Sequence, residues 1–219
     1  YFHALALRTL EQPATQYYAT ARAYLSGDNG WQNWQQLGLQ GLAEVVARID
    51  EDNNDVLLCQ AMPKMAAVPR NVLLGFLENA TPGLNLTLAI SDSLAQVVAD
   101  NASAADLAAF ARGLSGSSSV PQRQQLLGAI LAHPEARSIE VLSAIGSRCW
   151  LDLSDERLQI YLEHLAAVGQ DSFITLIADL MTLPSMRERI LAAFRNPERS
   201  DTLSAAIGKL MNLARENMQ

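Results

Sequence analysis

The spacing of apolar residues along the chain predicts a series of α-helices. Residues on one side of a helix recur every three or four positions, and long stretches of the chain follow this interval. The clearest apolar stripes are Leu158, Tyr161, Leu162, Leu165 and Val168, and Leu203, Ala206, Ile207, Leu210 and Leu213. Only residues 84–90 (LNLTLAI) alternate as a strand would, but they follow Thr81-Pro82 and continue into SDSLAQVVAD, which favours a helix. The pattern predicts an all-α fold.

Proline and capping residues indicate where the helices begin. A proline in the first turn loses no hydrogen bond, and a Ser or Asp before that turn accepts hydrogen bonds from its free N–H groups. The predicted starts lie at Pro13, Pro69, Pro82 and Pro121, and at the caps Ser103, Ser154, Asp171 and either Ser185 or Ser200. We expect helices of about 10 to 18 residues joined by short turns.

Two segments in the second half of the chain resemble each other. AHPEARSIEVLSAIGSR (132–148) and RNPERSDTLSAAIGKL (195–210) share a proline, a glutamate, an Arg-Ser pair, Leu-Ser-Ala and Ile-Gly in the same order. Pro134 and Pro197 lie 63 residues apart, the length of two helical hairpins of about 31 residues each. Chance agreement in a chain rich in Ala and Leu is the alternative, and we favour the repeat.

The LSAIG and LSAAIG segments are similar to the second helix of HEAT-type repeats, which are helical hairpins typical of binding scaffolds. A tetratricopeptide repeat is the alternative, because its opening pattern matches WQQLG (34–38). It fails because Gly41, Asp50 and Asn54 occupy the positions of its aromatic, Ala and Phe residues. The resemblance therefore implies a HEAT-like stack of antiparallel helical hairpins, an α-solenoid, over residues 1–219 as one domain.

Two features concern the organisation of that domain. Residues 113–122 (GLSGSSSVPQ) contain Gly and Ser that we expect to bury little, which predicts a mobile loop or a hinge at 113–120 within one solenoid. The helical spacing that already begins at Tyr1 predicts a fragment of a longer chain. FHALALRTLEQPA followed by GWQNWQQLGLQGLAE also resembles the carboxy-terminal part of an uncharacterised family of gamma-proteobacterial proteins, which implies a bacterial cytosolic origin and assigns no functional residue.

Composition and charge narrow the classes of partner. The 23 acidic and 16 basic residues give a net charge of −7, which repels phosphate and argues against nucleic acid as a partner. The local group Arg187, Arg189, Arg195 and Arg199 is interleaved with glutamates, as on a solvated helix face. The sequence contains no long apolar run or signal segment, and its two cysteines lie far apart, so we expect a cytoplasmic protein without a membrane segment or disulfide.

The acidic stretch 50–55 (DEDNND) is the sharpest candidate for chemistry. Within it, EDNND (51–55) resembles the motif with which helical isoprenoid synthases hold magnesium against a diphosphate. A second acidic cluster and basic residues for the diphosphate are missing, since 151–157 is better explained by the Ser154 cap. A calcium loop fails because Asp55 and Ala61 replace its glycine and its last glutamate. We favour a turn that ends one helix after Ile49 and caps the next.

The remaining candidates are aromatic and histidine residues. Tyr17, Tyr18, Tyr24, Trp31 and Trp34 form a candidate protein interface, with packing between the first two helices as the favoured alternative. Each histidine stands alone, and the serine in GLSGS lacks the second glycine of a nucleophile elbow.

The sequence thus predicts a non-catalytic protein-binding or scaffold module, with a protein partner and no catalytic, cofactor-binding or metal residues. The alternative is a helical metal- and diphosphate-dependent enzyme, or a small-molecule binder, that uses residues 50–55. The oligomeric state is left open.

Overall fold

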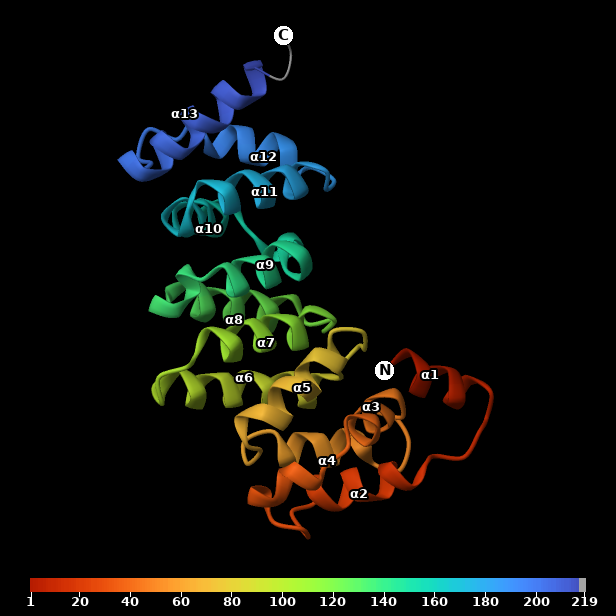
Figure 1. The fold of residues 1–219 in the computed structure, drawn as a ribbon. Helices are drawn as coiled ribbons and strands as arrows, with labels where there is room; N and C mark the ends of the chain where they lie inside the picture. Colours follow the sequence, from red (N-terminus) through yellow and green to blue (C-terminus); the bar gives the residue numbers. More distant parts are fainter. Residues whose placement is uncertain (217–219) are drawn as a thin grey trace. The chain divides into compact units, whose positions relative to one another are not determined.

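The computed structural model describes residues 1–216, which are helical and contain no strand (Figure 1). This confirms the predicted all-α class. The chain divides into two compact units, Tyr1–Leu126 and the residues from Leu127 onward, and the boundary falls inside helix α8 (Val120–Ala132).

In the first unit, alternate helices contact one another in two rows. One row holds α1 (Phe2–Thr9), α3 (Leu39–Ala47), α5 (Ala67–Leu77) and α7 (Ala104–Ser115). The other holds α2 (Gln16–Leu25), α4 (Asn54–Ala61) and α6 (Leu84–Ala99). The rows meet where α2 packs on α3 and α6 packs on α7, and a short 3-10 helix, η1 (Trp31–Gln36), leads from α2 towards α3. A core of fully shielded leucines lies between the rows, including Leu42, Leu73 and Leu107.

The second unit has the same alternation. One row holds α9 (Ile139–Arg148), α11 (Gln170–Met181) and α13 (Asp201–Glu216), and the other holds α10 (Asp155–Val168) and α12 (Met186–Ala193). Two short 3-10 helices, η2 (Pro134–Arg137) and η3 (Trp150–Asp152), flank α9. The helices of the first row begin 31 residues apart, and so do α10 and α12. The pair Phe173 and Phe194, with ring centroids 6.3 Å apart, packs in the core.

Most predicted helix starts lie within three residues of the observed ones. Pro69 and Pro121 lie in the first turns of α5 and α8. The hydroxyls of Ser103, Ser154 and Ser200 each accept a hydrogen bond from a first-turn N–H group.

Two of the candidate caps are wrong. Asp171 is the second residue of α11, because Gly169, with φ near 150°, takes the cap position. The hydroxyl of Ser185 bonds the carbonyl of Pro184 and leaves the first turn of α12 uncapped.

Residues 113–122 are more buried than predicted. The first three belong to α7, and Gly113 is buried where a Cβ atom would lie 2.5 Å from Cδ2 of Leu74. Ser117 is only 3% exposed, and its hydroxyl lies 2.8 Å from the hydroxyl of buried Thr87. The expectation that this stretch buries little is wrong, because glycine permits close helix contact and each buried hydroxyl has a partner.

A buried ion pair joins α5 to α7. Arg70, only 7% exposed, lies 2.6 Å from Asp106, and its guanidinium covers the ring of Phe110 at 5.3 Å. Burial alone would raise the pKa of Asp106, but hydrogen bonds from Ser103 and Asn71 and the charge of Arg70 lower it on balance. Asp106 therefore stays charged and completes the capping box with Ser103.

Replacement of Gly41 by Ala is expected to destabilise the first unit. Its Cβ atom would lie 2.2 Å from the carbonyl oxygen of Tyr17, so α2 and α3 would have to separate. We expect the free energy of unfolding in denaturant to fall by about 1–3 kcal/mol. Gly75→Ala is the matched control, because nothing lies within 4 Å of its Cβ position, and it should raise stability by about 0.5–1 kcal/mol. Equal effects of the two changes would contradict the close contact.

His164 on α10 is expected to make stability depend on pH. Its Nδ1 is buried without a hydrogen-bond partner in the described structure, and burial together with Arg137 lowers its pKa below 6.5, outweighing Glu163. The unfolded chain then binds more protons than the folded one below pH 6.5, so stability falls as the pH decreases through that value towards the folded pKa. Denaturant titrations at about pH 7.5 and 5 should show a smaller loss for His164→Gln than for the wild type. Identical losses would argue against burial of the imidazole.

Candidate functional site

Two carboxylates of the acidic stretch 50–55 are neutralised by residues of the same unit. The guanidinium of Arg8 lies 2.6 Å from Asp50 and 2.9 Å from Glu51, and Arg48 lies 2.9 Å from the second oxygen of Glu51. The hydrogen bond from Arg8 lowers the pKa of Asp50. These carboxylates already have cationic partners on α1 and at the end of α3.

The other half of the stretch forms a turn held by a tyrosine. Burial raises the pKa of Tyr18, so its hydroxyl stays protonated, donates to Asp52 at 2.8 Å and accepts from the amide of Asn54 at 2.8 Å. Asp52 and Asn53 have positive φ, which reverses the chain between α3 and α4. Helix α3 ends at Ala47, two residues earlier than predicted, and the side chain of Asn53 makes no cap bond to α4.

The structure separates the aromatic candidates. Tyr18 and Tyr24 are buried, and Trp31 packs edge-on against Tyr24 with ring centroids 5.5 Å apart. Trp34 is half-buried, and Tyr17 is exposed by 45%. Two of the five side chains thus belong to the core, and Tyr17 is the most exposed of the five.

The histidines and cysteines do not assemble into a reactive group. The Nδ1 of His133 accepts a hydrogen bond from the N–H of Glu135 and caps η2. Cys59 and Cys149 form no disulfide within residues 1–216, and burial raises the pKa of Cys59. Within residues 1–216, no group of three His, Cys, Asp or Glu side chains could hold a metal ion.

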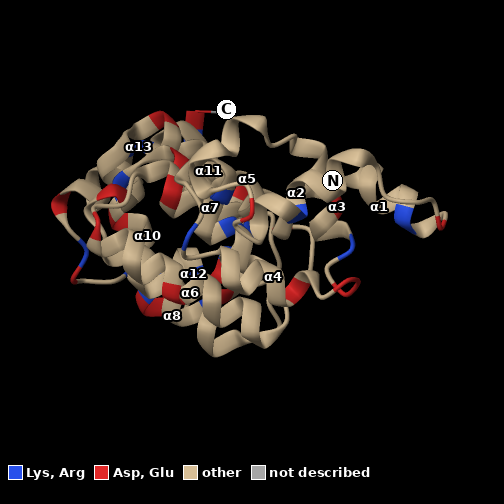
Figure 2. Ribbon diagram, turned by 90° about the horizontal axis from the view of Figure 1, so that it is seen from below, with Lys and Arg blue, Asp and Glu red and all other residues tan. Residues whose placement is uncertain are grey.

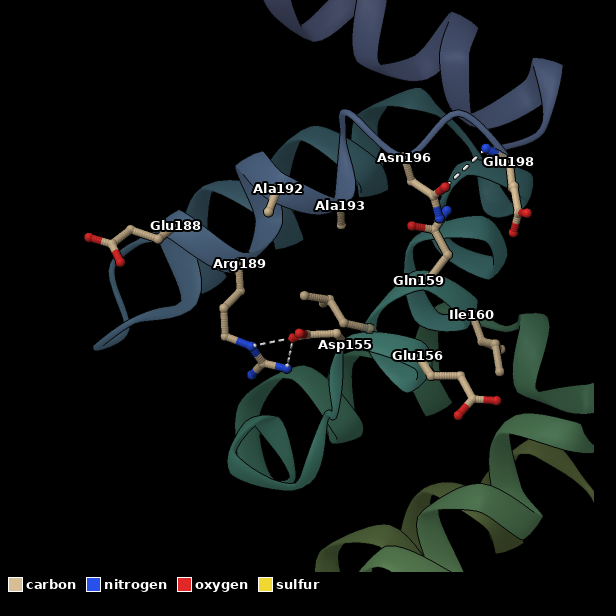
Figure 3. Close-up of a pocket in the computed structure, with 11 residues that line it drawn as sticks. Asp155, Glu156, Gln159, Ile160, Glu188, Arg189, Ala192, Ala193, Asn196 and Glu198 are labelled. Carbon is tan, nitrogen blue, oxygen red and sulfur yellow. Dashed lines mark hydrogen bonds and ion pairs between the residues drawn. The ribbon is translucent and has the colours of Figure 1, made fainter.

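A groove of about 770 Å³ lies between α10 and α12 in the second unit (Figure 3). It is lined by side chains between positions 155 and 160 of α10, between 188 and 193 of α12, and by Asn196 and Glu198 beyond α12. Leu158 forms an apolar floor, and the small side chains of Ala192 and Ala193 leave the space above it unfilled. Such a volume can admit one or more side chains of another molecule.

The charged residues of the groove are unevenly paired. Arg189 reaches across from α12 to Asp155 of α10, with nitrogen and oxygen 2.9 Å apart, and also bonds the carbonyl of Leu153 (Figure 3). Glu156, Glu188 and Glu198 have no ion pair in the described part of the chain. Glu188 and Glu198 lie towards opposite ends of the α12 wall, while Glu156 points away from α12. The groove therefore has an apolar floor and an acidic rim.

The sequence does not predict this groove. The signal it contains is a pair of helix starts, SDER and SMRER, that lie 31 residues apart and each place acids in a first turn. The arginines at 187–199 are predicted to lie on one solvated helix face with their neighbouring glutamates, but Arg189 pairs with a residue of another helix. Arg199 instead bonds Ser204 and the carbonyl of Asn196.

Acidic and basic residues are scattered over the chain, and Figure 2 shows no row of bases along one helix. None of the helices in residues 1–216 is long and apolar enough to cross a membrane.

Comparison with known proteins identifies a family and no activity. No curated protein and no solved structure matches the chain. The expectation that the chain belongs to an uncharacterised family is confirmed at that level. Residues 1–211 match the family described as "Protein of unknown function (DUF3549)", and the chain belongs to this family.

Proposed function

We propose that the chain is a non-catalytic protein-binding module, built as a HEAT-like stack of helical hairpins, and that the α10–α12 groove is its binding site. The observation that carries the proposal is the groove itself, with an apolar floor at Leu158 and three acidic side chains on its rim that have no ionic partner in the described chain. Carboxylates with no internal partner, grouped around apolar surface, favour contact with another molecule.

The arrangement of helices supports the stack. Helices α9, α11 and α13 contact in sequence and begin 31 residues apart, the interval predicted from Pro134 and Pro197. In a helical repeat, each hairpin covers the apolar face of the next and leaves grooves between neighbouring helices of one row. The groove between α10 and α12 has this position.

A protein partner fits the groove better than a nucleic acid does. The rim holds four acids and one arginine, and Asp155 already neutralises that arginine, so phosphate would be repelled. We also propose a cytoplasmic location, which two cysteines that form no disulfide within residues 1–216 favour.

Site-specific photocrosslinking in cells that naturally express the chain tests the proposal. A photoreactive phenylalanine analogue at Ile160 or Ala192, both on the groove, should give an adduct with a protein. The same photoreactive analogue in place of Val56, which is exposed by 48% in the first unit, is the control and should not give that adduct. Absence of a protein adduct at both groove positions, or equal adducts at all three, would argue against the groove as a binding site.

The rival, a magnesium- and diphosphate-dependent enzyme that uses residues 50–55, gives a separate test. Because Arg8 and Arg48 occupy Asp50 and Glu51, we expect no rise in the unfolding temperature when magnesium and pyrophosphate are added together. A ligand at about 100 times its Kd would add about 2.7 kcal/mol and be readily seen. A rise that disappears in both Asp52→Ala and Asp55→Ala would restore the enzyme interpretation.

A further inference from the structure

We infer that the occupant of the α10–α12 groove is a basic amphipathic helix of a partner protein. This inference rests on the proposed function and specifies its partner. Three properties of the groove carry it: the charge of its rim, the apolar floor, and the length of the helices that line it.

The rim selects for positive charge. Arg189 and Asp155 neutralise each other, so the groove is left with Glu156, Glu188 and Glu198. First-turn acids also offset a helix dipole, which accounts for part of the presence of Glu156 and Glu188. It does not account for Glu198, which lies between α12 and α13. A partner with arginine or lysine on its flanks would pair with all three.

The floor selects for an apolar face. Leu158 is fully buried at the bottom, Ile160 is exposed by 38% at one edge, and the α12 wall is formed by Ala192 and Ala193. A leucine or methionine inserted above Leu158 would remove apolar surface of both partners from water. The aliphatic stems of arginine and lysine would cover the edges while their charged ends reach the glutamates.

The dimensions favour a helix. The lining residues extend over positions 155–160 of α10 and 188–193 of α12, each of which corresponds to about 8 Å along the helix axis at 1.5 Å per residue. One and a half to two turns of a docked helix cover this length. Helix-in-groove recognition uses apolar residues at intervals of three and four, with charges on either side.

A second copy of the chain is disfavoured as the occupant. Each chain has a net charge of −7, so two copies repel each other, whereas a basic partner is attracted at long range. A bound metal ion is disfavoured by geometry, because no three carboxylates converge within residues 1–216.

The test uses a fluorescent peptide of about 18 residues, designed as a helix with leucine along one face and lysine and arginine on its flanks. Its affinity for the whole chain is measured by fluorescence anisotropy. Two control peptides keep the length: one replaces the bases by glutamate, and the other replaces the leucines by serine. We expect binding of the first peptide alone, weakened when salt is raised from about 50 to about 300 mM.

Variants of the chain locate the site. The triple change Glu156→Gln, Glu188→Gln and Glu198→Gln should weaken binding about tenfold or more, since it removes every unpaired rim charge. The matched control is Glu135→Gln, Glu140→Gln and Glu216→Gln, which removes the same charge at exposed positions outside the groove and should leave the affinity unchanged. Ala192→Trp, which fills the groove from an exposed position, should abolish binding while the unfolding temperature stays close to that of the wild type.

The outcomes separate the two proposals. If the photocrosslinks at Ile160 and Ala192 succeed but the basic peptide fails to bind, the groove remains a binding site and the basic helix is wrong. The basic helix is also wrong if the glutamate peptide binds equally well, or if both triple variants lose affinity alike. If spermidine competes for the groove as strongly as the peptide does, the occupant is a small polycation and the helix is wrong. If the crosslinks fail, both proposals fall.

Discussion

Helices inside a row are covered on two sides by the neighbouring helices of that row. Helix α5 contacts α3 and α7, and α11 contacts α9 and α13. The distance between neighbouring helices then depends on the side chains between them. Where a glycine faces another backbone, as Gly41 faces Tyr17, the helices touch. Where the small side chains of Ala192 and Ala193 on α12 face α10, which Arg189 bridges, a groove stays open. The same packing rule produces both the core and the candidate site.

Glutamates of one helix accept hydrogen bonds from the residue that precedes a neighbouring helix. Glu44 of α3 is 1% exposed and accepts hydrogen bonds from the N–H and hydroxyl of Thr15, the cap of α2. Glu163 of α10 accepts the N–H and hydroxyl of Ser200, just before α13. A buried or half-buried carboxylate is tolerable there because several donors and the positive end of a helix compensate for its lost hydration. These two acids are therefore structural, in contrast to the unpaired glutamates on the groove rim.

The sequence predicts the helices better than their contacts. Periodicity identifies α6 despite its strand-like start, and Ser103, Ser154 and Ser200 act as the predicted caps. These features depend on neighbours in the sequence. The burial of Ser117 depends on Thr87, which lies 30 residues away, and the neutralisation of Asp50 depends on Arg8, 42 residues away. Nothing local to either residue contains that information. The same holds for the groove, whose walls come from two hairpins.

The candidate site is distinguished by acids that have no partner within the described fold. An acid that a cation or a hydroxyl of the same unit binds has a sufficient structural explanation, and Asp50, Glu51 and Asp52 belong to that class because Arg8, Arg48 and Tyr18 bind them. Glu198 also lies in a turn between helices, but its carboxylate has no ion pair or hydrogen bond in the described chain, and it borders the same groove as Asn196 and Ala193. An unpaired charge at the surface costs little folding free energy, so by itself it is weak support for a binding site. Its support becomes stronger when it borders apolar surface, because a partner that buries this surface must also neutralise the charge.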